Sequence, residues 1–130
     1  MPLMPPRATT SGNRVQPNAA ASARLAVDVA SEKQGADIVL LDVHTVTAFT
    51  DFMVILTAAS ARQVSALAND LTEAVEQSGL PLHHREGTAE SGWVLLDFAD
   101  IVVHIFSPDQ RDYYRLEQVW NKAKTLLHVQ

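Results

Sequence analysis

The chain contains no cysteine among its 130 residues, so disulfides, thiolate metal sites and a cysteine nucleophile are excluded. Charged residues are also sparse, at 19% against 47% apolar residues, a balance typical of one globular domain. Apolar runs such as residues 38–41 and 101–103 are far too short to span a bilayer. The chain shows no apolar stretch of the signal-peptide kind. We therefore expect a cytoplasmic protein without a membrane partner.

Basic residues are also fewer than acidic ones. The 10 Lys and Arg and the 15 Asp and Glu give a formal net charge of −5. Binding to a phosphate backbone usually needs a basic face, which makes an acidic chain a poor candidate for it. A basic protein partner suits the charge better, since complementary fields speed encounter and suppress wrong partners. We expect no direct, specific readout of nucleic acid.

Residues 1–18 differ from the rest of the chain, because they are rich in proline and carry almost no large apolar residue. Such a segment cannot bury enough apolar surface to offset its ordering entropy. Its arginines precede the first acid, Asp28, as in organellar transit peptides, but the prolines and the lack of an amphipathic face favour a plain tail. We expect a disordered tail over 1–18 and a single folded domain over 19–128.

Hydrophobic periodicity predicts strands and helices in the rest of the chain. Short apolar runs predict four strands, over residues 37–43, 51–57, 93–97 and 100–106, and we expect a fifth, short strand over residues 82–86. Apolar stripes predict three helices, over residues 18–34, 60–79 and 107–127. The last two strands are close enough to form a hairpin across Phe98 and Ala99. The fold class is therefore α/β (α+β), with a mixed sheet of roughly five strands packed with about three helices.

Two helix starts carry a capping box, in which a serine hydroxyl and a glutamine side chain satisfy each other's backbone N–H groups. Ser60 and Gln63 form one, and Ser107 and Gln110 form the other, with Pro108 at the first helical position. The last helix would then carry one continuous apolar stripe, formed by Tyr113, Leu116, Trp120, Ala123 and Leu127.

Metal and acid–base chemistry have few candidates. His83 and His84 are adjacent on a strand and point to opposite faces, so they cannot easily chelate one ion, with or without His104. Asp97 and Asp100 flank a tight turn, where aspartates are common for local hydrogen bonding, and that interpretation is favoured over paired catalytic carboxylates. We expect no metal and no cofactor.

The segment from Thr57 to Arg62 could bind an anion, because a strand ends there and a helix begins. However, alanines stand where phosphate loops have glycine, and the chain has no Gly-x-x-x-x-Gly-Lys or Gly-x-Gly-x-x-Gly motif. The spacing of Asp97 and Asp100 also does not place two carboxylates alternately on one strand. We therefore expect a protein that is not an enzyme.

Alternation places Trp93, Leu95 and Asp97 on one face of their strand, opposite Val94 and Leu96. If helices cover one side of the sheet, the other face is exposed or meets a partner. Periodicity does not decide which face is covered, because the strand is apolar on both.

Several blocks together resemble the ribosomal silencing factor (RsfS/Iojap) family, in the family's order and over about residues 22–122. They are ADIVLLDV (36–43), TDFMVILT (50–57), SARQV (60–64), REG (85–87), WVLLD (93–97), DIVVHIF (100–106) and RDYYRLEQVW (111–120). The chain departs from the family in having Ala58 and Ala99 at turn positions where glycine is frequent.

The resemblance implies a nucleotidyltransferase-like topology without catalytic residues. It also implies a protein that binds large-subunit ribosomal protein fourteen, sterically blocks joining of the small subunit, and represses translation when nutrients are short. Self-association of the free protein, as a homodimer, is a further implication. A nucleotide-binding enzyme and a generic dimerisation module are the competing hypotheses.

We expect the partner to dock on the strand face that carries Trp93. The docking patch, as we call it, comprises Trp93, Leu95, Asp97, Asp100, His104, Tyr113 and Tyr114. Aromatic anchors with neighbouring acids suit a basic ribosomal protein.

Overall fold

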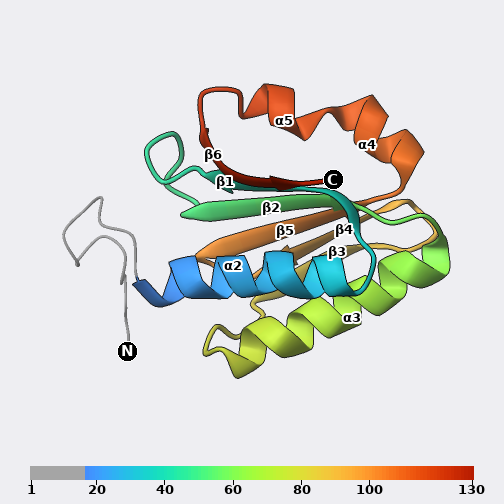
Figure 1. Ribbon diagram of the computed structural model, residues 1–130, viewed down its shortest axis with the longest axis horizontal. Helices are drawn as coiled ribbons and strands as arrows, with labels where there is room; N and C mark the ends of the chain where they lie inside the picture. The colour runs from blue at the N-terminus through green and yellow to red at the C-terminus, as the bar shows by residue number, and fades with distance from the viewer. Residues whose placement is uncertain (1–16) are drawn as a thin grey trace.

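The computed structural model describes residues 17–130 (Figure 1). The first sixteen residues of the predicted tail lie outside the described residues. The last two belong to a helix instead, because α2 spans Pro17–Glu32 and proline suits a first helical turn. No helix in residues 17–130 is long and apolar enough to cross a membrane.

One mixed sheet organises the described chain. Its order is β3-β4-β5-β2-β1-β6, and every neighbouring pair is antiparallel except the central pair β2 and β5. The strands are β1 (Ala36–Asp42), β2 (Phe52–Thr57), β3 (His84–Thr88), β4 (Trp93–Asp97), β5 (Ile101–Phe106) and β6 (Lys124–Val129). Together with α2, the helices are α3 (Ala61–Gln77), α4 (Pro108–Tyr114) and α5 (Leu116–Val119). The α/β fold class predicted from the sequence is confirmed.

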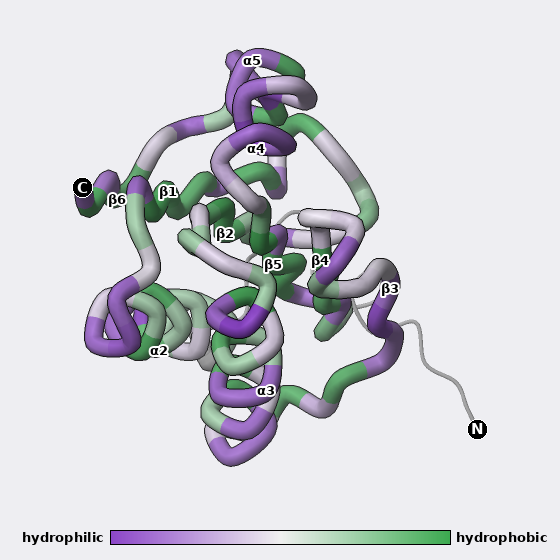
Figure 2. Tube along the Cα trace, turned by 90° about the vertical axis from the view of Figure 1, so that its right-hand side faces the viewer, coloured by the Kyte–Doolittle hydropathy of each residue, from purple (hydrophilic) through white to green (hydrophobic). Residues whose placement is uncertain are grey.

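Helices α2 and α3 lie side by side against one face of the sheet, as Figures 1 and 2 both show. Alternate strand residues enter the main core on this side, among them Leu40, Val54, Leu96 and Val103. Burying each such side chain contributes roughly 1.5–3 kcal/mol, which makes this face the chief source of stability.

The opposite face is covered less completely, by the segment that contains α4 and α5 (Figure 2). A smaller cluster lies there, formed by Val39, Leu41, Val43, Met53, Ile55 and Phe106. Partly buried Trp93, Leu116, Trp120 and Ala123 pack against it. This uneven cover leaves part of the sheet open next to β4.

The serine half of both predicted capping boxes is confirmed, but the reciprocal glutamine contacts differ from the prediction: the Gln63 side chain accepts from the Ala59 N–H, and the Ser107 N–H donates to the Gly92 carbonyl. The Ser60 hydroxyl accepts a hydrogen bond from the Gln63 N–H at 3.1 Å, and Ser107 accepts from Gln110 at 3.3 Å. Pro108 is the first residue of α4. The predicted hairpin of β4 and β5 is also present, whereas β3 lies two residues later than predicted.

The prediction of one continuous helix over residues 107–127 is wrong. Arg115 has left-handed backbone angles (φ 49, ψ 53), which end α4, and α5 is a single short turn. Residues 124–129 then form β6, which pairs with β1 and adds a sixth strand. Pairing satisfies the backbone groups of β1 that would otherwise face solvent along a sheet edge.

Candidate functional site

The structure settles which face of β4 is covered. Val94 and Leu96 are fully buried in the main core, on the side where β4 contacts α3. Trp93, Leu95 and Asp97 are only partly buried, and they lie on the face that α4 and α5 cover incompletely. His104 joins them from the neighbouring strand, where it stands opposite Leu95. Four members of the docking patch therefore share one sheet face.

Aromatic rings gather at the Trp93 end of this face. The Trp93 ring centroid lies 4.5 Å from that of Tyr114 and 5.1 Å from that of Phe106. Tyr113 meets Tyr114 edge to face at 5.0 Å. Phe106 is buried, but Tyr113 is 76% exposed and Tyr114 40% exposed. The result is an aromatic cluster anchored in the protein and open to solvent at its rim.

A cavity of about 220 Å³ lies beside this cluster, between β3, β4 and α4. Trp93, Leu95 and Tyr114 supply its apolar walls, and Glu86 and Gln110 supply polar ones. Glu86 stands opposite Leu95 in the sheet and accepts a 2.6 Å hydrogen bond from His84. A partner side chain entering this cavity would meet an apolar wall with a carboxylate beside it.

The two aspartates of the docking patch lie at the other end of β4, about 13 Å along the strand from Trp93 at roughly 3.3 Å per residue. Asp97 accepts a 2.8 Å hydrogen bond from the Ala99 N–H and so holds the turn to β5, in which Ala99 adopts a left-handed φ of 71. This confirms the turn interpretation for Asp97. The docking patch thus spans the length of the strand, with aromatics at one end and acids at the other.

Trp93 and His104 are joined by a hydrogen bond from the indole N–H to the Nδ1 of His104, at 3.1 Å. Burial lowers the pKa of His104 from 6.5 to about 4, so the imidazole is neutral near pH 7. Its closest neighbours on β4 and β2, Leu95 and Ile55, carry no charge. His104 is thus a hydrogen-bonded residue of the sheet.

The free energy of unfolding should fall as the pH is lowered from about 6.5 to about 4 because of His104. In this window the unfolded chain binds a proton that the folded imidazole does not, so acid favours unfolding. The hydrogen bond from His128 holds the pKa of Asp37 below its usual value of 3.8. The stabilising contribution of the Asp37 carboxylate is therefore lost at a lower pH than that of His104. Urea unfolding across the window measures the effect. His104→Phe should flatten the profile, and an equally steep profile would contradict the assignment.

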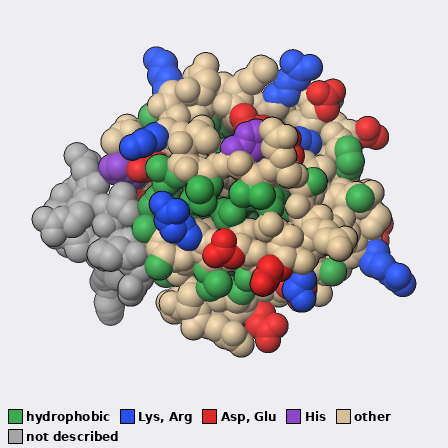
Figure 3. All heavy atoms as spheres, in the orientation of Figure 1, with side chains coloured by type: hydrophobic (Ala, Val, Ile, Leu, Met, Phe, Trp, Pro, Cys, Tyr) green, Lys and Arg blue, Asp and Glu red, His purple; other side chains and the backbone are tan. Residues whose placement is uncertain are grey.

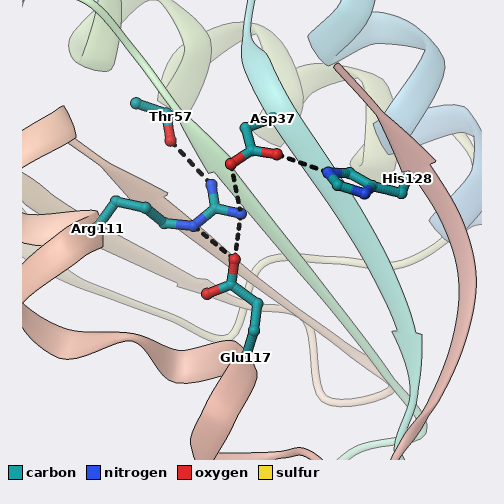
Figure 4. Close-up of polar contacts among 5 residues, drawn as sticks. All are labelled: Asp37, Thr57, Arg111, Glu117 and His128. Atoms are coloured by element: carbon teal, nitrogen blue, oxygen red, sulfur yellow. Dashed lines mark hydrogen bonds and ion pairs between the residues drawn. The ribbon is translucent and has the colours of Figure 1, made fainter.

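A second polar cluster, which was not predicted from the sequence, connects α4 and α5 to the sheet (Figure 4). Arg111 is 8% exposed and donates through Nε to Glu117 at 2.8 Å and through Nη1 to Thr57 at 2.8 Å. Asp37 lies 3.6 Å from Nη2 of Arg111 and accepts a 2.6 Å hydrogen bond from His128. Asp37 has a left-handed φ of 50 and lies where the pairing register of β1 with β2 shifts. The cluster ties α4, α5, β1, β2 and β6 together.

Two observations bear on the metal and anion sites that were considered from the sequence. Within residues 17–130 no three His, Asp or Glu side chains are grouped as metal ligands. The start of α3 is occupied by Gln63, whose Oε1 accepts from the Ala59 N–H at 2.6 Å and whose Nε2 donates to the Gln34 carbonyl at 2.9 Å. The N–H groups of Ala59 and Gln63 are therefore bonded within the protein, and an anion at this helix start would have to displace these contacts.

Comparisons with known proteins agree on one family. The sequence model of the family described as "Ribosomal silencing factor during starvation" matches residues 16–130. The "Ribosomal silencing factor RsfS" of Halalkalibacterium halodurans is 35% identical over 103 residues, which cover 79% of this chain and 88% of the relative. The mouse protein named "Mitochondrial assembly of ribosomal large subunit protein 1" is 27% identical over 72% of this chain and 42% of its own length.

A solved structure supports the same assignment at the level of the fold. The crystal structure of a Chromobacterium violaceum protein superposes with a TM-score of 0.75 at 35% sequence identity, covering 78% of this chain and 85% of that one. Because the family match extends along residues 16–130 and a relative shares more than a third of its aligned residues, the chain belongs to the ribosomal silencing factor family.

Proposed function

We propose that this protein binds the large ribosomal subunit through large-subunit ribosomal protein fourteen and thereby blocks joining of the small subunit. Membership of the family implies a role in ribosome-related regulation of translation. The name of the mouse relative, which concerns the large subunit, supports the choice of subunit. The protein would act in the cytoplasm and would catalyse no reaction.

The observation that carries this proposal is the aromatic cluster of Trp93, Tyr113 and Tyr114 at the open end of the sheet face. Partly exposed aromatic rings on a strand and a helix are typical anchors of protein interfaces, since they bury large areas at small entropic cost. Glu86 lines the cavity beside these rings, and Asp97 lies at the other end of β4, so the docking face carries negative charge, which favours a basic partner.

The proposed mechanism is steric exclusion. A protein docked on the subunit face needs only to overlap the position of the incoming small subunit and to dissociate slowly. The strength of repression then follows from the affinity of the docking patch, because no chemical step contributes to it.

Trp93→Ala should weaken binding to the large subunit by about 2 kcal/mol, or roughly thirty-fold in Kd, because it removes the centre of the aromatic cluster. Trp120→Ala is the matched control. It removes the same side chain where Trp120 packs on the second core cluster, outside the docking patch, and should cost stability without comparable loss of affinity. Wild-type affinity in folded Trp93→Ala, verified by circular dichroism, would exclude Trp93 as an anchor.

Co-sedimentation with separated subunits and with joined ribosomes tests the function itself. We expect the protein to pellet with the large subunit alone and to reduce the fraction of joined ribosomes as its concentration rises. Purified protein fourteen should compete for the docking patch. Failure to pellet with either subunit at moderate salt would contradict the proposal and leave nucleotide binding as the next hypothesis to test.

Self-association of the free protein, as a homodimer, is a second part of the proposal. Apolar side chains gather across the middle of the face that carries β6 and β1 (Figure 3). Leu126, Leu127 and Val129 of β6 are only partly buried, and β6 is an edge strand whose outer backbone groups can pair with another strand. Sedimentation velocity of the free protein distinguishes monomer from dimer.

A further inference from the structure

His104 combines deep burial with an unused polar atom. Its residue surface is 6% exposed, and Leu95 and Ile55 stand opposite it on the two neighbouring strands. The imidazole is therefore a polar group set in an apolar part of the sheet face.

The hydrogen bond from Trp93 fixes the tautomer of this imidazole. An indole N–H can only donate, so Nδ1 of His104 must accept and cannot carry a proton. In the neutral ring the proton then resides on Nε2, which is left as a donor. Trp93 thus determines which hydrogen-bonding group His104 presents.

The Nε2 atom has no hydrogen-bond partner within residues 17–130, where Trp93 supplies the one polar contact of His104. Every fully buried side-chain nitrogen and oxygen in this part of the chain has a partner. Nε2 is therefore not fully buried and lies within the small exposed part of the residue. This N–H donor costs little free energy while water can accept its hydrogen bond. A partner that covered it without offering an acceptor would leave it unsatisfied and would lose binding free energy.

We propose that the Nε2–H of His104 donates a hydrogen bond to a main-chain carbonyl oxygen of the docked partner and so fixes the partner's register on the sheet face. This inference rests on the proposed function. A carbonyl fits because it accepts without bringing charge onto an apolar floor. A lysine or arginine of the basic partner cannot accept a hydrogen bond, so cations are excluded here and directed to Asp97 and Glu86.

Two substitutions separate the donor from the shape of the ring. His104→Phe keeps a planar ring but removes both nitrogens, whereas His104→Gln keeps an amide N–H donor and an acceptor for Trp93. We expect His104→Phe to weaken binding to the large subunit at least tenfold and His104→Gln to stay within about threefold of wild type. Circular dichroism and urea unfolding establish that each variant is folded at the assay temperature.

Nitrogen NMR chemical shifts of the wild-type imidazole distinguish a hydrogen-bond donor to the partner from a residue with a purely structural role. We expect a protonated Nε2 and an unprotonated Nδ1 in the free protein, with the Nε2 proton shifting and becoming protected when the large-subunit protein binds. Binding of folded His104→Phe at wild-type strength, or equal losses in both variants, would overturn the donor role while wild-type binding still supports the proposed function. Failure of the wild type to bind would overturn both.

Discussion

Gly87→Ala is expected to lower the free energy of unfolding by about 3 kcal/mol or more. A Cβ at this position would lie 2.0 Å from the main-chain carbonyl oxygen of Trp93, and the backbone has a φ of +87, which L side chains rarely adopt. The clash involves main chain on both sides, so no side-chain rotation relieves it. Strand β3 must therefore shift away from β4.

The same substitution should also impair docking, because Gly87 lines the cavity beside Trp93 and Tyr114. Gly79→Ala is the matched control, since Gly79 has a φ of +112 but open space around the new Cβ. It should cost about 1 kcal/mol from backbone strain alone and leave binding unchanged. Urea denaturation and co-sedimentation measure the two effects. Equal destabilisation by both substitutions would show that the clash with Trp93 is not the cause.

Arg111→Met should destabilise the fold by about 2–3 kcal/mol. Removing the guanidinium leaves the Glu117 carboxylate, the Thr57 hydroxyl and Asp37 without their shared donor. The estimate stays below the cost for fully buried pairs because the Glu117 side chain is 34% exposed. Methionine retains most of the aliphatic packing, so the loss reports chiefly on the polar contacts.

Arg115→Met provides the control for this prediction within the same segment. The Arg115 side chain is 59% exposed, and its polar contacts within residues 17–130 are with Asp112, so its removal should cost less than about 1 kcal/mol. Thermal unfolding of both variants, with tyrosine and tryptophan fluorescence as separate probes, measures the difference. Similar midpoints for the two variants would mean that the Arg111 cluster adds little to stability.

Local signals in the sequence predicted much of the fold. The strands around 37–43, 51–57, 93–97 and 100–106 were recognisable because each is a short β-branched run between polar turns. Helix α3 was recognisable from its cap and its stripe, which includes buried Val64, Leu67 and Leu71. In these segments local preference and tertiary packing favour the same structure.

The chain from Arg115 onward could not be predicted in this way. Tyr113, Leu116 and Trp120 have helical spacing, but Arg115 between them adopts a left-handed conformation. Side chains of α4 contact residues that are distant in the sequence; Arg111, for example, donates a hydrogen bond to Thr57. Strand β6 likewise depends on an open edge at β1, which no local pattern reveals.

The residues of the candidate site were likewise predicted only in part from the sequence. Alternation along β4 predicted that Trp93, Leu95 and Asp97 share a face, and pairing with β5 adds His104. The Arg111 cluster was missed because its members come from separate parts of the chain and meet only in the folded sheet. Its one sequence signal is the presence of Arg111 and Glu117 within the same motif.

The parallel pairing of β2 with β5 at the centre of the sheet has a consequence for how the chain folds. The hairpins β1–β2 and β4–β5 can each form from neighbouring residues, but their union needs segments that are separated by α3, β3 and β4. Such non-local pairing is slow to form. Until it forms, β2 and β5 each present an open, apolar edge, and the chain is most prone to aggregate during this interval.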